Sequence, residues 1–286
     1  MMGRRVIALL LLLPVLLFSG CSTLLDGHRV AVLEEGHLRV HFIDVGQGDS
    51  ALIEFPNNMT MLIDGGNRPD GKAVVSYLKR AGIDSIDFLI ATHPHEDHIG
   101  GLIKVVEDIP VGKVYMPRIT HTSNTFMQFI SLLRDKGHNL YRARSGVVIL
   151  DEDGLKVEML APNRDSYEKL NNYSAVVKVS YRDTGIIFMG DAEKESEMEI
   201  NPLKAKAQII KIGHHGSGSS TSPEFLQAVN PGYAVISVGS NNDYGHPHAE
   251  TLELLENRGI KVLRTDELGT IVITTDGSTI NIVNLR

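Results

Sequence analysis

Apolar residues recur along the chain in short runs separated by turn residues. Leu38–Val45 alternates at first and then becomes continuously apolar, which predicts a strand running from an edge into a core. Ser50–Phe55 and Thr60–Ile63 predict two further strands, and the apolar spacing within Gly71–Ala81 predicts a helix. The run Phe88–Ala91 predicts a buried strand that delivers the residues after it into a loop.

Strands and helices continue to alternate after this point. The predicted helices are Ile99–Glu107, Ser123–Lys136, Ala192–Ile200, Pro223–Val229 and Ala249–Asn257. The predicted strands are Lys113–Met116, Gly146–Leu150, Lys156–Leu160, Ala175–Tyr181, Ile186–Met189, Gln208–Ile212, Tyr233–Val238, Lys261–Leu263, Thr270–Thr274 and Thr279–Asn284. No linker divides residues 37–286, so we expect one α/β domain with two sheets and helices on their outer faces.

The loop after the strand at Phe88–Ala91 has an unusual density of metal-binding residue types. Six consecutive positions, 93 to 98, hold three histidines and two carboxylates, and two glycines follow. Imidazole and carboxylate are ligands of borderline divalent ions such as zinc, and so dense a cluster is hard to pack without an ion. His93 and His95 alternate and can face one side of the loop, whereas Asp97 and His98 lie one turn on and can serve a second ion.

Two later strands also end on candidate ligands. Asp191 follows Ile186–Met189, and its two carboxylate oxygens suit it to bridge two cations. His214 and His215 follow Gln208–Ile212; if they continue that strand they point to opposite sides, so only one faces the metal. We prefer His214, which is nearer the strand end, with His215 in contact with a ligand or the substrate. Strand ends on one rim of such a fold are where distant ligands meet.

The loop before the helix Ala249–Asn257 holds two more histidines, His246 and His248, on either side of Pro247. Their spacing and the preceding glycine are compatible with a contact to a phosphate or leaving group. A purely structural role is an equally open interpretation. No residue pattern in this loop decides between the two.

The composition limits the choice of partners. The 286-residue chain has a formal charge of −7, so it lacks a global basic field that would capture nucleic acid. A polyanion would have to be held by a local patch or by metal ions. The candidate phosphate contacts are Lys211, Arg118, Arg142 and Arg144.

The N-terminus predicts export. Arg4-Arg5 precedes the apolar segment Val6–Phe18, as in a signal peptide spanning residues 1–20. Leu17–Cys21 resembles a bacterial lipoprotein signal, which implies that Cys21 becomes the lipidated first residue of the mature chain, followed by a tether over 21–36. An uncleaved anchor is the alternative. Because the removed segment carries two arginines and no acid, the mature charge becomes −9, and the single cysteine excludes a disulfide within the chain.

The strand-linked H-x-H-x-D-H run, the later Gly-Asp and the later histidines resemble the metallo-β-lactamase superfamily. The resemblance implies an αββα four-layer sandwich with a dinuclear metal site, and it implies that Asp64 orients the metal loop. Residues 38–286 resemble more closely the exported hydrolase domain of ComEC-type competence proteins. The motifs that carry this likeness are Phe42–Ser50, Thr92–Gly101, Phe188–Asp191, Lys211–Ser217, Tyr244–His248 and Arg264–Glu267. Asp44 and Ser217 belong to these motifs and are expected near the ligands or substrate.

One ligand expected from the superfamily pattern is missing. Many members supply a further histidine between the metal loop and the bridging aspartate, but the segment before Ala175–Tyr181 reads Asn171-Asn172-Tyr173-Ser174. His121 and His138 are the only histidines in that interval. One ion is therefore expected to have a weaker shell, completed by Asn172 or water.

The resemblance implies two divalent ions, zinc or alternatively manganese, that generate hydroxide for an in-line displacement. Asp97 would relay the proton and His248 would protonate the leaving oxygen. We therefore expect an exported, membrane-tethered phosphodiesterase or nuclease acting on extracellular DNA. The alternatives are a cell-wall or lipid phosphoesterase of the teichoic-acid phosphorylcholine esterase type, and a non-catalytic DNA-binding accessory. The sequence indicates no protein partner.

Overall fold

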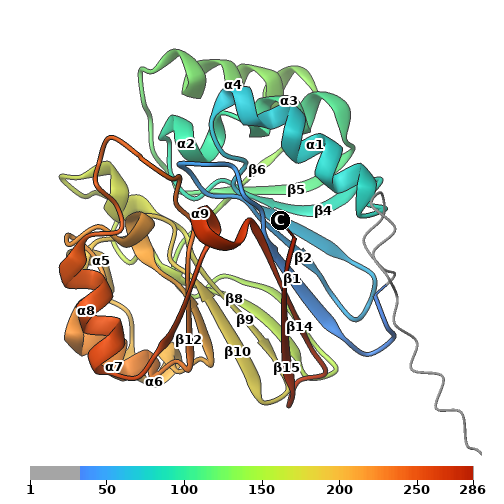
Figure 1. Cartoon of the computed structure of the whole chain (residues 1–286). Coiled ribbons are helices and arrows are strands. Elements are labelled where there is room, and N and C mark those ends of the chain that lie inside the picture. The colour runs from blue at the N-terminus through green and yellow to red at the C-terminus, as the bar shows by residue number, and fades with distance from the viewer. Residues whose placement is uncertain (1–32, 286) are drawn as a thin grey trace, which may run out of the picture.

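Two β-sheets pack face to face and carry helices on both outer faces (Figure 1). This computed structural model describes residues 33–285. The predicted signal peptide and Cys21, and most of the predicted tether, lie outside the described residues. Within 33–285, no helix has both the length and the apolar character needed to span a membrane.

The first sheet has eight strands in the order β15-β14-β1-β2-β3-β4-β5-β6. Their bounds are β1 Leu38–Phe42, β2 Ala51–Glu54, β3 Thr60–Ile63, β4 Ile86–Ile90, β5 Val111–Met116, β6 Leu140–Arg142, β14 Thr270–Thr275 and β15 Ile280–Leu285. The strands from β15 to β3 pair antiparallel, and those from β3 to β6 pair parallel. The last hairpin of the chain thus extends the sheet that the first strands begin.

The second sheet has seven strands in the order β13-β12-β11-β10-β9-β8-β7. Their bounds are β7 Val148–Glu152, β8 Leu155–Ala161, β9 Val176–Tyr181, β10 Thr184–Phe188, β11 Ile209–Lys211, β12 Tyr233–Ile236 and β13 Lys261–Arg264. Strands β10 to β13 run parallel. Each sheet therefore contains a parallel half whose carboxyl ends can carry a site.

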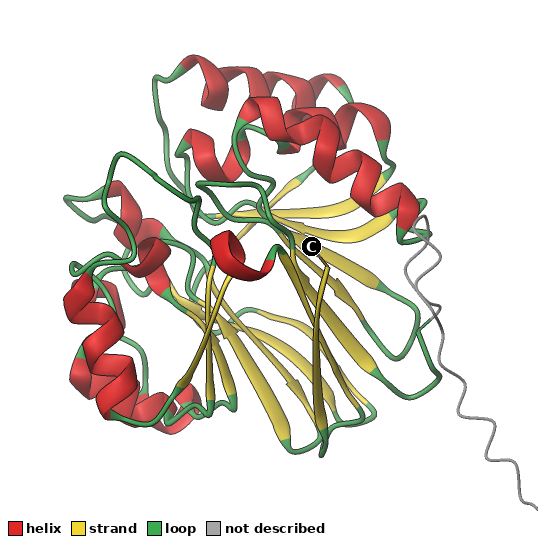
Figure 2. Cartoon of the chain, viewed as in Figure 1, coloured by secondary structure: helices red, strands yellow, loops and turns green. Residues whose placement is uncertain are grey.

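Helices cover the two outer faces (Figure 2). On the first sheet lie α1 Gly71–Arg80, α2 Glu96–Ile99, α3 Leu102–Asp108 and α4 Asn124–Asp135. On the second lie α5 Lys194–Glu197, α6 Pro202–Ala205, α7 Pro223–Val229 and α8 Ala249–Asn257, and α9 Thr265–Leu268 follows β13. Single 3-10 turns occur at Arg68–Asp70, Leu170–Tyr173 and Gly213–Gly216.

Three apolar layers hold these elements together, one between the sheets and one under each set of helices. Strand β2 shows why the sequence gives this arrangement. Ala51 and Ile53 enter the layer between the sheets, whereas Leu52 enters the layer beneath α1 and α3. Both faces of the strand are buried, so its pattern is continuously apolar. The αββα sandwich expected from the sequence is confirmed.

Two predicted helices are wrong in extent. The predicted helix Ile99–Glu107 corresponds to α3, which begins three residues later at Leu102, and the separate short helix α2 ends at Ile99 before it. A Cβ at Gly101 would lie 1.9 Å from the carbonyl oxygen of Gly65, so only glycine fits at the junction between α2 and α3. The predicted helix Ala192–Ile200 contracts to α5 because residues before Lys194 form the turn after β10. Strand β6 and helices α2, α6 and α9 were not predicted.

Candidate metal centre

The metal loop, residues 93–98, follows β4 and is held in place by Asp64. One carboxylate oxygen of Asp64 accepts a hydrogen bond from the Thr92 backbone N–H (2.8 Å), and the other accepts one from the Thr92 hydroxyl (2.6 Å). That second oxygen also lies 2.8 Å from Nδ1 of His98. Burial raises the pKa of Asp64, and the His98 ring opposes that increase. Asp64 therefore lies where the superfamily resemblance places it, next to a candidate ligand.

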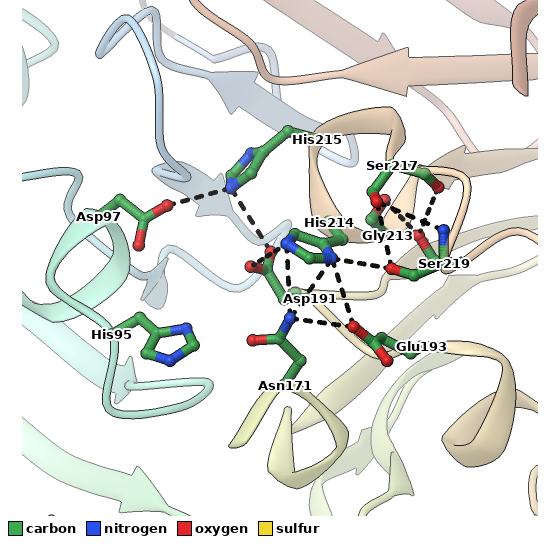
Figure 3. Close-up of polar contacts among 12 residues, drawn as sticks. His95, Asp97, Asn171, Asp191, Glu193, Gly213, His214, His215, Ser217 and Ser219 are labelled. Carbon is green, nitrogen blue, oxygen red and sulfur yellow. Dashed lines mark hydrogen bonds and ion pairs between the residues drawn. The ribbon is translucent and has the colours of Figure 1, made fainter. Parts of the chain in front are cut away.

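Four side chains converge at the first donor group: Asp97, His98, Asp191 and His215, with donor atoms within 4.8 Å of one another. Nε2 of His98 lies 3.2 Å and Nε2 of His215 lies 3.5 Å from Oδ1 of Asp191. Nε2 of His215 also lies 3.3 Å from Oδ2 of Asp97 (Figure 3). The loops that bring these residues together follow β4 of the first sheet and β10 and β11 of the second.

A second donor group lies on the other side of Asp191 and contains His93, His95 and Asp191. Nε2 of His93 is 3.0 Å from Nδ1 of His95 and 3.7 Å from Oδ2 of Asp191. Each carboxylate oxygen of Asp191 thus faces a different group of imidazoles. This is the arrangement that a residue shared by two cations requires.

The donor set fits divalent ions. Nε2 of His98, Nε2 of His215 and Oδ1 of Asp191 are all buried without a hydrogen-bond partner among the described residues. Nδ1 of His215 lies 3.0 Å from the Ser237 carbonyl oxygen, which can only accept, so the proton of the neutral ring sits on Nδ1 and Nε2 keeps its lone pair. Nδ1 of His98 is likewise engaged by Asp64. Burying such atoms unpaired is costly, whereas a cation would satisfy all three.

The pKa shifts show the sign of the local field. Burial opposes the charged form of His215, but Asp191 and Asp49 outweigh burial and raise its pKa to about 10. His98 is buried too, and Asp191 and Asp97 raise its pKa well above the usual value. In return, these rings hold the pKa of Asp191 well below its usual range in spite of burial. The pocket is therefore strongly attractive to positive charge.

His214 and His215 do not continue β11, so the alternation of side chains along a strand does not apply to them. Both residues adopt left-handed conformations, with φ 51° and 53°, in the turn Gly213–Gly216. His215 is buried and belongs to the first donor group, whereas the half-buried His214 lies outside both groups. By distance, His215 is thus the better placed ligand, and the preference for His214 alone does not match the geometry.

The segment that lacks the expected histidine still reaches the site, but through Asn171. Nδ2 of Asn171 lies 3.3 Å from Nδ1 of His214. Asn172, the residue expected to complete the shell, instead hydrogen-bonds Glu195 and the backbone N–H of Glu193. Neither His121 nor His138 joins a donor group among the described residues.

An open pocket lies over the donor groups. Its lining consists of Gln47, Asn67, His95, Glu96, Asp97, Asp191, His214, His215, Tyr244 and His246. Tyr244 is 67% exposed and stacks on His246 with ring centroids 5.6 Å apart. His248 does not line this pocket; its Nδ1 accepts the Gly218 backbone N–H, and its Nε2 lies 3.3 Å from the Tyr244 carbonyl oxygen. The loop therefore presents His246 to the pocket.

Several predicted contacts lie elsewhere. Asp44 is exposed and closes its own turn by accepting the Gly46 N–H. Ser217 hydrogen-bonds Ser219, which contacts His214. Arg118 and Arg142 line a separate groove at the β5–β6 edge, and Arg144 is exposed and outside the metal pocket.

Lys211 cannot contact a substrate phosphate because it is only 3% exposed. Its ammonium forms a buried ion pair with Asp49, whose other oxygen lies 3.3 Å from Nδ1 of His215. Sequence reasoning missed this pair. The available signals were a lone lysine at the end of an apolar strand and an aspartate in the turn Gly46–Asp49.

The four-layer fold and the paired donor groups define a metal-dependent hydrolase of the αββα type. Residues 43–240 match the family described as the metallo-beta-lactamase superfamily, and the chain belongs to it. ComE operon protein 3 of Bacillus subtilis (strain 168) is 34% identical over 251 residues, covering 81% of this chain and 32% of that protein. Competence protein ComA of Neisseria gonorrhoeae is 30% identical over 276 residues, covering 92% and 37%.

This chain thus spans about a third of the length of these curated relatives. Among solved structures, the archaeal metallo hydrolase Igni18 from Ignicoccus hospitalis superposes with a TM-score of 0.53 at 18% identity. The superposition covers 82% of this chain and 98% of Igni18. This likeness supports the fold. The names of the curated relatives confirm that the sequence resembles ComEC-type competence proteins.

Proposed function

We propose that the protein is a metal-dependent phosphodiesterase that cleaves nucleic acid, DNA first among the candidates, outside the cytoplasm. One observation carries the metal-dependent part: the two oxygens of Asp191 face two separate histidine groups beneath an open pocket. The nucleic-acid part is supported by the motifs shared with competence proteins and by the names of the curated relatives.

The side chains present are suited to two ions. Asp97, His98, Asp191 and His215 would hold one, and His93, His95 and Asp191 would hold the other. When bound, zinc or manganese ions would supply a nucleophile near neutral pH and neutralise charge on the phosphoryl oxygens. The charge of the chain itself is negative, so these ions would also be the principal attraction for a polyanion.

The remaining work falls to residues of the pocket. Burial opposes the charged form of Asp97, but His98 and His215 hold its pKa below the usual range. Asp97 is therefore a carboxylate at neutral pH and can orient the water or receive its proton. Tyr244 and His246 line the pocket but belong to neither donor group, so they would contact the part of the substrate away from the scissile bond.

The test uses purified protein loaded with Zn²⁺ or Mn²⁺ and assayed on single- and double-stranded DNA, RNA, bis-p-nitrophenyl phosphate and a β-lactam. We expect cleavage of phosphodiesters and none of the β-lactam. His95→Ala and Asp191→Ala should lower turnover at least 100-fold with unchanged circular dichroism, whereas the remote His138→Ala should not. Failure of both metal forms to cut any phosphodiester refutes the proposal.

The same assay separates the non-catalytic alternative. A DNA-binding accessory would show salt-dependent DNA affinity that survives His95→Ala, with no turnover in any variant. A choline-type headgroup would call for an aromatic cage, but Tyr244 is the only Phe, Tyr or Trp in the described pocket lining. No observation in the pocket therefore favours the hypothesis of a phosphorylcholine esterase.

Export and anchoring through Cys21 belong to the same proposal. They are supported by the charged start, apolar segment and small residues before Cys21. Cells expressing the full chain and fed a labelled fatty acid should label the wild-type protein but not Cys21→Ser, and the label should travel with the membrane fraction. Unlabelled wild-type protein in the soluble cytoplasmic fraction contradicts this part of the proposal without touching the catalytic part.

A further inference from the structure

The second donor group is one ligand short. It contains His93, His95 and Asp191, whereas the first group contains four side chains. The chain has an asparagine pair where many superfamily members have a histidine. A site that lacks one protein ligand would bind its ion more weakly unless another side chain fills the position.

We propose that His214 supplies the missing ligand, so that the adjacent histidines 214 and 215 serve one ion each. The inference rests on the metal site of the proposed function but not on its substrate. Both histidines are then ligands, His215 of the first ion and His214 of the second. The geometry around Asp191 is its first support.

Asp191 has imidazoles on both sides. On the side of Oδ1 lie Nε2 of His98 at 3.2 Å and Nε2 of His215 at 3.5 Å. On the side of Oδ2 lie Nε2 of His93 at 3.7 Å and Nε2 of His214 at 3.8 Å. His214 is thus as near to its carboxylate oxygen as His93 is, and it faces the oxygen of the incomplete group.

The backbone explains how neighbouring residues can reach opposite sides. His214 and His215 both have left-handed dihedral angles, which non-glycine residues adopt at an energetic cost of about 1 kcal/mol or more. The two rings are inclined by 66° with centroids 6.2 Å apart. In Figure 3 dashed lines join both rings to the Asp191 carboxylate. Strain of this kind persists where the surrounding structure imposes it, and the buried His215 ring is held through Nδ1 by the Ser237 carbonyl oxygen.

The contacts of the His214 ring also suit a ligand. Its Nδ1 lies 3.1 Å from the Ser219 hydroxyl and 3.7 Å from a carboxylate oxygen of Glu193. A proton on Nδ1 is directed at this hydroxyl and carboxylate, which leaves the Nε2 lone pair toward Asp191. Histidine ligands of metals are characteristically held by such a carboxylate or hydroxyl at the other nitrogen. Figure 3 shows Glu193 and Ser219 on the side of the ring away from Asp97.

Asn171 completes the argument. It comes from the segment where the histidine is missing, and its side-chain nitrogen lies 3.3 and 3.4 Å from the two nitrogens of His214. The segment and His214 thus meet at one place. A histidine at either of these two places could reach the same side of Asp191, and in this chain that histidine is His214.

The experiment measures metal binding rather than turnover. Metal-free protein is titrated with Co²⁺ and followed by absorption and calorimetry for wild type, His214→Ala, His215→Ala and the remote control His138→Ala. We expect two ions in wild type and in the control. Each single variant at 214 or 215 should retain one tight ion and lose at least ~100-fold in affinity for the other, since loss of an outer partner alone costs about 10–100-fold.

A rescue variant makes the test specific. In His214→Ala, the added change Asn171→His places an imidazole in the neighbouring position and should restore the second ion, with a Co²⁺ spectrum like that of wild type. The proposal is overturned if His214→Ala binds two ions with wild-type affinity, if wild type binds only one, or if the folded double variant still binds only one. Two ions without phosphodiester cleavage would refute the proposed function and leave this inference intact.

Discussion

The buried ion pair of Asp49 and Lys211 gives the sharpest test of how the site is supported. The loop after β1 supplies the aspartate and the end of β11 supplies the lysine, so the pair joins the two sheets. The exposed fractions are 6% for Asp49 and 3% for Lys211. The perturbation is Lys211→Met, which keeps the apolar length of the side chain and removes its charge.

The expected cost follows from what is left behind. In Lys211→Met, the Asp49 carboxylate stays buried with one oxygen that already lacks a hydrogen-bond partner. Removing one partner of a buried pair typically costs about 3–5 kcal/mol of unfolding free energy. The His215 ring, whose Nδ1 lies 3.3 Å from Oδ1 of Asp49, offsets part of the charge left behind, so the cost should lie toward the lower end of this range. The double variant Asp49→Leu/Lys211→Met removes both charges and should be less destabilised than Lys211→Met alone.

The assay is urea unfolding of the metal-free protein in chelator, followed by circular dichroism. Lys104→Met is the matched control, since it breaks the exposed pair of Lys104 and Asp108 and should cause no resolvable change. A second readout is Co²⁺ affinity, which should fall because Asp49 contacts the His215 ring. If Lys211→Met unfolds at the wild-type urea concentration, or if the two single costs simply add in the double variant, the reasoning is wrong.

Three other outcomes are expected. Burial lowers the pKa of His41 although Glu54 lies 2.7 Å away, so the unfolded chain binds more protons than the folded chain below about pH 6.5. Stability should therefore fall on acidification through that value, and His41→Gln should flatten this part of a plot of urea midpoint against pH. An unchanged plot would contradict the prediction. Gly101→Ala should cost about 1–3 kcal/mol or more of unfolding free energy and displace the metal loop, because its Cβ would lie 1.9 Å from the Gly65 oxygen. The control Gly232→Ala, with no neighbour closer than 3.9 Å, should fold normally. Equal melting temperatures for the two variants would refute the steric argument. Chelation should lower the melting temperature, and Zn²⁺ or Mn²⁺ at a hundredfold excess over Kd should restore about 2.7 kcal/mol per site; a melting curve indifferent to chelator would show that the donor groups hold no ion.

Much of the architecture was readable from the sequence because burial on both faces and strand-end residues leave strong local signals. The apolar runs placed the strands, and the carboxyl ends of β4, β10 and β11 brought Asp97, Asp191 and the paired histidines to one rim. The short elements β6, α2, α6 and α9 were not predicted because three or four residues carry too little periodicity to recognise.

The details of the site were less predictable because they depend on distant partners. Lys211 reads as a phosphate contact until Asp49, 162 positions away, is found beside it. The two left-handed histidines could not be foreseen either, because only a few per cent of non-glycine residues adopt that conformation, even though histidine is enriched among them. Asn171 rather than Asn172 meets the site, a one-residue difference that only the folded turn decides.

The stacked contact of Phe42 with Phe188, centroids 5.7 Å apart, has a consequence for the ions. The two rings come from opposite sheets and line the same small cavity as Asp49 and Lys211. Donor atoms must hold position to about 0.2 Å, and they too are divided between the sheets. Metal affinity therefore depends on how the two sheets are aligned with each other and reports any change in that alignment. Trimming either buried ring, which is not itself a donor, should weaken ion binding before the fold itself is lost.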